Sequence, residues 1–248
     1  MFLPIGDDQV RGGFTPHLAY GLIVVNVAIF IYQSSLEPFQ IEQFLTTYGS
    51  IPKEISSGED YFTLLTSMFL HGGFMHLAGN MLFLWIFADN VEASVGSKVF
   101  LVVYLLSGLA AHFGQIWFDP DSNVPMVGAS GALAGIMGAY LVMFPRSQVR
   151  GYLFVFRVAL PAFAFLIFWF VQQSFSGYAS LQAAHEQGGG VAWWAHIGGF
   201  LFGVLAGFWM RRNFRLPSHE DGYQMPPQDN RPSFPQAGRS TKNDNHYL

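Results

Sequence analysis

Hydrophobic residues fall into six long stretches along the chain, and polar residues, glycines and prolines separate each stretch from the next. A helix that crosses a bilayer needs about 20 mostly apolar residues. The pattern therefore predicts an all-α membrane protein with six spanning helices, at residues 17–33, 74–87, 98–117, 130–144, 152–172 and 192–210. The fourth helix should end before Pro145, because proline cannot continue a helix.

These stretches divide the chain into three regions. Residues 1–16 form an N-terminal segment, residues 17–211 form the six-helix domain, and residues 212–248 form a tail. The tail is rich in Pro, Ser, Asn and Gln, a composition that predicts disorder. Asp7 and Asp8 precede the first hydrophobic stretch where a signal peptide would be basic, so we expect that stretch to stay as a membrane anchor.

The first connection, at about residues 34–72, is too long for a structureless loop in a compact domain. Its apolar residues predict short helices associated with the membrane interface: Phe39, Phe44, Leu45, Phe62, Leu64, Leu65 and Phe69.

Composition supports a lipid environment and narrows the chemistry. Hydrophobic residues make up 51% of the 248 residues and charged residues only 11%, whereas soluble domains carry about 25% charged residues. The net charge of −4 argues against nucleic acid as a partner and leaves the lipid bilayer as the expected surroundings. The chain has no cysteine, which excludes disulfides and thiolate catalysis.

Basic residues predict the orientation of the helices. They gather at one set of helix ends, whereas the opposite ends carry only Lys53; the first set comprises Arg11, Lys98, Arg146, Arg150, Arg211, Arg212 and Arg215. Both termini should then lie in the cytoplasm, and the second, fourth and sixth helices should begin at the outer face. Four polar residues lie near those beginnings and hence at a similar depth: His76, Asn80, Ser130 and His196.

Ser130 opens the fourth helix within the sequence Gly-Ala-Ser-Gly at 128–131. A serine there could cap the helix or act as a nucleophile, with Gly128 and Gly131 allowing a substrate backbone to approach closely. His196 lies inside a predicted span, where an ionisable residue is a candidate for function. Small residues predict close packing of the fourth and sixth helices, which would bring Ser130 to His196: Gly131 and Gly135 on one, and Gly199, Gly203 and Gly207 on the other.

His71, His76 and Asn80 form a third group of polar residues. His76 and Asn80 are four residues apart and share a helix face, where their N–H groups could stabilise an oxyanion. A metal site is the alternative, but His71 and His76 are five residues apart and no HExxH motif is present. We therefore expect neither a metal nor another cofactor.

These three motifs resemble the signatures of the rhomboid proteases, in the order typical of that family, over about residues 60–210. The resemblance implies a six-helix rhomboid-like bundle with a catalytic dyad of Ser130 and His196. It also implies an oxyanion hole formed by His76, Asn80 and the backbone N–H of Ser130. The chain departs from many members at Glu59-Asp60, where Trp-Arg is common, and at Ala134, where some carry a tyrosine that stacks on the histidine.

The expected function is that of an intramembrane serine endopeptidase that cleaves near the outer membrane face. Its substrates would be single-span membrane proteins with small or helix-breaking residues near the cut, because a helix hides its own peptide bonds. We expect a multi-pass protein of the cell or inner membrane. Two alternatives stay open: a non-catalytic relative that binds membrane proteins, and a small transporter or channel.

Overall fold

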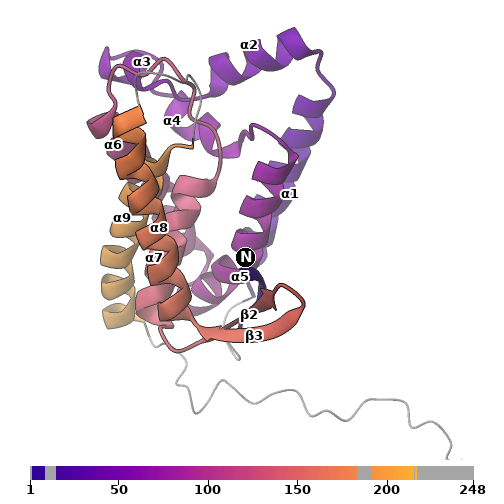
Figure 1. The fold of residues 1–248 in the computed structure, drawn as a ribbon, viewed down its shortest axis with the longest axis vertical. Helices are drawn as coiled ribbons and strands as arrows, with labels where there is room; N and C mark the ends of the chain where they lie inside the picture. Colours follow the sequence, from indigo (N-terminus) through magenta and orange to yellow (C-terminus); the bar gives the residue numbers. More distant parts are fainter. Residues whose placement is uncertain (1, 9–14, 184–190, 215, 217–248) are drawn as a thin grey trace, which may run out of the picture.

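The computed structural model describes residues 2–8, 15–183, 191–214 and 216, and the predicted disordered tail lies almost wholly outside them. Long helices stand side by side, with the short helices of the first loop at one end and a small sheet at the other (Figure 1). The helices are α1 (His17–Ser34), α2 (Pro38–Tyr48), α3 (Pro52–Ser56), α4 (Thr63–Thr66), the 3₁₀ helix η1 (Ser67–Phe69), α5 (Phe74–Val95), α6 (Ser97–Phe118), α7 (Ser130–Met143), α8 (Ala162–Ala183) and α9 (Trp193–Asn213).

Within the described residues, three helices are long and apolar enough to cross a membrane: α1, α6 and α9. A fourth span is possible by the same measure if α4, η1 and α5 act together, although the chain bends there by 92°. α7 is apolar but only 14 residues long. Nearly every residue of α7 is buried, which is typical of a central helix that is hydrophobic on all sides. The fold is thus mostly helical, as predicted, and the count of six spans stays a prediction.

The prediction of a helix from residue 152 was wrong. Residues 148–161 form a hairpin of β2 (Gln148–Leu153) and β3 (Phe156–Pro161), and α8 begins only at Ala162. This segment is rich in aromatic and β-branched residues, which favour strands. β1 (Phe2–Gly6) pairs antiparallel with β2, so part of the N-terminal segment completes a three-stranded sheet in the order β1-β2-β3. The all-α prediction therefore missed this sheet.

Buried polar residues join the sheet to the helices. Oδ2 of Asp7 accepts hydrogen bonds from the Tyr140 hydroxyl and, at 2.6 Å, from the Asn90 amide. Asp8 forms an ion pair with Arg150 of β2. The fully buried Glu92 accepts from the backbone N–H groups of Leu18 and Ala19 at 3.0 and 2.6 Å. The Glu92 carboxylate satisfies backbone N–H donors at the start of α1 that have no partner within the helix, and its negative charge interacts favourably with the positive end of the helix dipole.

The first loop contains short helices, as predicted, and it also holds the segment that leads into α7. Ser50 and Met126 exchange backbone hydrogen bonds of 3.0 and 2.8 Å. The backbone N–H of Gly128 donates to the carbonyl oxygen of Ser67 at 2.9 Å. The Ser67 hydroxyl in turn lies 3.2 Å from Nε2 of His112 on α6. The loop therefore positions residues 126–128 directly before Ser130.

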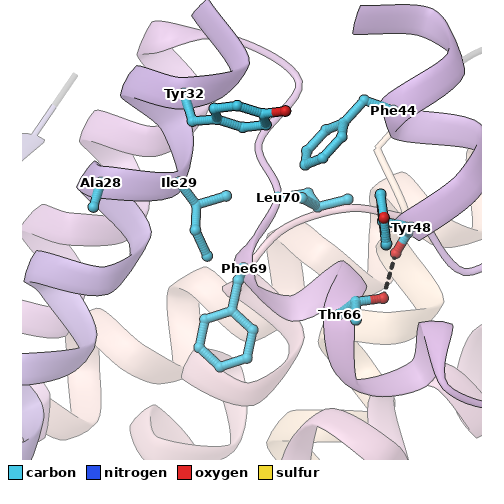
Figure 2. Close-up of a pocket in the computed structure, with 8 residues that line it drawn as sticks. All are labelled: Ala28, Ile29, Tyr32, Phe44, Tyr48, Thr66, Phe69 and Leu70. Atoms are coloured by element: carbon cyan, nitrogen blue, oxygen red, sulfur yellow. Dashed lines mark hydrogen bonds between the residues drawn. The ribbon is translucent and has the colours of Figure 1, made fainter.

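An apolar groove of about 400 Å³ separates the C-terminal half of α1 from the first loop (Figure 2). Tyr32 and Ile29 extend into it from α1, and Phe44 and Tyr48 face them from α2. The hydroxyl of Thr66 closes the far side by donating to the backbone oxygen of Tyr48 at 2.7 Å. The polar residues singled out by the sequence are not among those that line this groove.

Candidate active site

Ser130 and His196 meet in the structure although 66 residues separate them in the chain. Ser130 is the first residue of α7, and His196 lies in the first turn of α9. Oγ of Ser130 lies 2.8 Å from Nε2 of His196. Ala129 occupies the N-cap position of α7, and within the described residues no side chain caps it. The serine therefore does not act as the cap of this helix.

Glycines allow α7 and α9 to approach closely enough for this contact. A Cβ on Gly199 would overlap the carbonyl oxygen of Gly131, and a Cβ on Gly203 would overlap that of Gly135. A Cβ on Gly207 would lie 2.9 Å from the Cα of Ala139. Since no side chain fits at these points, the two backbones touch along about two turns. The predicted packing of these small faces is confirmed.

His76 and Asn80 extend from the first turns of α5 toward the same site. The Asn80 amide nitrogen lies 3.0 Å from Nε2 of His71. His71 is fixed in turn by Gln33 of α1, whose side-chain amide forms hydrogen bonds of 3.0 and 3.2 Å with the His71 backbone. His71 therefore holds the Asn80 amide in place, and that amide keeps a second N–H for another acceptor.

Gly128 is the residue that allows His76 to lie beside the start of α7. Its φ of +124° is a backbone conformation that side chains with a Cβ rarely adopt. A Cβ at this position would also lie 2.8 Å from Nε2 of His76 and 3.5 Å from the amide nitrogen of Asn80. Glycine is therefore required here both by the backbone conformation and by the lack of space.

Sequence reasoning missed the residues that surround the His196 ring. Gln173 of α8 is buried, and its Oε1 lies 2.7 Å from Nδ1 of His196. The Trp169 ring lies 5.9 Å from the imidazole, centroid to centroid, and the Trp193 ring approaches at 6.2 Å with its plane perpendicular. Trp169 and Gln173 are four residues apart, a spacing that could have revealed them, but the predicted helix ended at residue 172.

These side chains line a pocket of about 250 Å³ between α5, α7, α8 and α9. It combines the four polar residues predicted from the sequence with a largely apolar wall: Met75, His76, Gly79, Asn80, Phe83, Ser130, Leu133, Met137, Trp169, Gln173, Trp193 and His196. A concave apolar pocket with a few convergent polar groups is typical of an active site. A serine and a histidine in contact, beside amide and imidazole N–H donors, can perform nucleophilic catalysis on a carbonyl.

The fold and this site define a helical membrane protein with a half-buried serine–histidine pair where α7 meets α9. Residues 58–213 match the Rhomboid domain family. The chain is 30% identical to Rhomboid protein 1, mitochondrial, of Saccharomyces cerevisiae over 79% of its own length and 54% of that protein. It is 27% identical to Rhomboid protease GlpG of Yersinia enterocolitica over 79% of its own length and 63% of that protein.

A third relative, Rhomboid protease GluP of Bacillus subtilis, is 32% identical over 51% of this chain and 24% of that protein. The chain belongs to the rhomboid family, because the family match covers more than half of its residues. It spans about half the length of the yeast relative and less than two thirds of each bacterial one.

Proposed function

We propose that the protein is an intramembrane serine endopeptidase in which Ser130 is the nucleophile and His196 is the general base. The 2.8 Å contact between Oγ of Ser130 and Nε2 of His196 carries this proposal. His196 accepts the serine proton while Oγ attacks the scissile carbonyl carbon. The amide nitrogen then leaves with the proton from His196, and an acyl-enzyme remains. Water, activated by the same histidine, hydrolyses the ester and restores Ser130.

His76, Asn80 and the backbone N–H of Ser130 form the oxyanion hole in this proposal. The first backbone N–H groups of a helix have no partner within it, and the positive end of the dipole favours an anion. The ring of His76 and the second N–H of the Asn80 amide face the same pocket. Removal of one such donor costs about 10²–10³-fold in kcat in other serine hydrolases.

The substrate is a single-span membrane protein whose helix unwinds near the cut, which favours small or helix-breaking residues there. It reaches the dyad between α5 and α8, because both helices line the pocket that contains Ser130 and His196. Phe163 and Phe168 of α8 are exposed, in keeping with a surface that meets lipid or substrate, whereas Phe165 is buried. A disulfide that ties the outer halves of α5 and α8 should block cleavage of a membrane substrate, and unchanged cleavage would exclude this route.

Both termini lie in the cytoplasm in this proposal, and the pocket opens to the outer side of a cell or inner membrane. Arg150, Arg211 and Arg212, together with Lys98, support the orientation because they belong to the end of the bundle that carries the sheet. Arg11 and Arg215 lie outside the described residues. The relatives include a mitochondrial protein and bacterial proteins. A fluorescent tag on either terminus, accessible from only one side of the membrane, would test the proposed orientation.

The decisive experiment uses the full chain, purified in detergent, with a single-span substrate and a fluorophosphonate probe. We expect cleavage and labelling that mass spectrometry maps to Ser130, and loss of both in Ser130→Ala. Ser94→Ala is the matched control, because that hydroxyl donates to the carbonyl of Asn90 in its own helix, at 2.8 Å. Cleavage retained by Ser130→Ala, or none by the wild type on a broad set of substrates, would favour a non-catalytic or transport role.

A further inference from the structure

Gln173 approaches the side of the His196 ring that faces away from Ser130. Its side chain is only 5% exposed, and Oε1 lies 2.7 Å from Nδ1 of the imidazole. The other end of the Gln173 amide is also engaged, because Nε2 donates to Oε1 of Gln172 at 2.8 Å. An amide nitrogen can donate but not accept, so this second bond directs the carbonyl oxygen toward the histidine.

This orientation determines which ring nitrogen carries the proton. A carbonyl oxygen can only accept, so Nδ1 of a neutral His196 must be the protonated nitrogen. Nε2 then presents a lone pair to the Ser130 hydroxyl, 2.8 Å away. In the opposite tautomer, Nε2–H would face the serine hydroxyl and could not take its proton. The tautomer with the proton on Nδ1 is therefore the one that general-base catalysis requires.

We propose that Gln173 is a positioning residue that holds His196 in the tautomer and orientation needed to deprotonate Ser130. This inference rests on the proposed function. Trp169 supports the same role from one turn earlier on α8, where its ring lies 5.9 Å from the imidazole. Together they perform the task that a stacking tyrosine performs in some family members, whose position is held here by Ala134. A neutral amide also avoids the cost of a buried carboxylate in a helix that meets lipid.

The test compares Gln173→Leu with wild type and with Ser174→Ala as the control, because the Ser174 hydroxyl donates to the Phe170 carbonyl of its own helix. For Gln173→Leu we expect kcat and the rate of fluorophosphonate labelling to fall about tenfold, or about 1.4 kcal/mol, with KM unchanged. Gln173→Glu should recover most of the rate, because its carboxylate oxygen still accepts from Nδ1–H. Ser174→Ala should match wild type.

A spectroscopic measurement separates positioning from a structural role. In protein labelled with ¹⁵N-histidine, the wild-type His196 signal should be that of the Nδ1-protonated form, and Gln173→Leu should show a mixture. Gln173→Met, of nearly the same length, serves as the second variant if Gln173→Leu does not fold. Wild-type kcat with a single unchanged tautomer in either variant would overturn this inference alone. Absence of Ser130 labelling in wild type would instead overturn the proposed function.

Discussion

Gly128 lies against His76, and its replacement by alanine tests whether His76 stabilises the oxyanion. The new Cβ would lie 2.8 Å from Nε2 of His76, so the ring has to move by about 0.6 Å to reach ordinary contact at 3.4 Å. A donor displaced by that amount no longer lies at hydrogen-bond distance from an oxyanion held at the start of α7. We expect kcat to fall by about 10²–10³-fold, the usual effect of losing one such donor.

Backbone strain has to be separated from this collision, because the φ of Gly128 is +124° and alanine there costs about 1–3 kcal/mol in stability. Gly96→Ala is the matched control. Gly96 also has a positive φ, +80°, but a Cβ there would meet nothing within 4 Å. Both variants should therefore unfold more readily than wild type in detergent, while only Gly128→Ala should lose activity per folded molecule.

The assay is cleavage of a single-span substrate at saturating concentration, normalised to the folded fraction from size-exclusion chromatography. Labelling of Ser130 by a fluorophosphonate is measured in parallel, because the phosphoryl oxygen of the probe occupies the same oxyanion hole. If Gly128→Ala cleaves at the wild-type rate while folded, His76 is not a donor to the oxyanion. Equal losses in Gly128→Ala and Gly96→Ala would show that strain alone explains the effect.

Gly203→Val should separate α7 from α9, because even a Cβ at residue 203 would overlap the backbone of Gly135. We expect this variant to lose about 1–3 kcal/mol in stability and to lose activity. Gly21→Val, at an open position on α1, should keep both stability and activity. Burial, and to a lesser extent nearby carboxylates such as Asp89, raises the pKa of Asp7 from 3.8 to about 8. Its contribution to stability is therefore complete below about pH 4 and is lost as pH rises to about 8, at up to about 1.4 kcal/mol per pH unit. Thermal unfolding at several pH values should show this decline in wild type but not in Asp7→Asn, and parallel curves would contradict it.

Much of the fold follows from hydrophobic length alone. The predicted helices at 17–33, 98–117 and 192–210 differ from α1, α6 and α9 by at most three residues at either end. The helix predicted to end at Phe87 continues to Val95 as α5, and its charged residues Asp89 and Glu92 are buried, Glu92 against the start of α1. The length of the hydrophobic stretch could not reveal this burial, since the start of α1, which contacts Glu92, lies more than 70 residues earlier in the chain.

The hairpin at 148–161 escaped prediction for a related reason. Apolar runs of strand length cannot be distinguished from the start of a buried helix by periodicity alone. Pairing with β1 decides the outcome, and β1 lies in a segment that carries no strand signal strong enough to be recognised. Tertiary contact therefore determines both this sheet and the late start of α8 at Ala162.

The candidate site could be predicted from the sequence because its reactive residues lie in short motifs near the beginnings of helices. Ser130, His196, His76 and Asn80 all line one pocket. Gln173 was missed, because the predicted helix ended one residue before it and a single glutamine there has no motif around it, so that its spacing from Trp169 gains meaning only from its neighbour in space. Its partner His196 lies 23 residues further along, on a different helix.

The residues of the candidate site lie on helices that are packed with unequal tightness. Ser130 and His196 stand on helices whose backbones touch at Gly131 and Gly199, so the spacing of their two backbones is fixed by contacts that no side-chain motion can change. Gln173 stands instead on α8, which borders the pocket and exposes much of its apolar surface. If a substrate helix displaces α8 as it enters, the oxygen of Gln173 leaves Nδ1 of His196 while the serine stays in place. In the proposed mechanism, His196 would then lose its preferred tautomer until α8 returns, and peptide-bond hydrolysis would be coupled to closure of the pocket around the substrate.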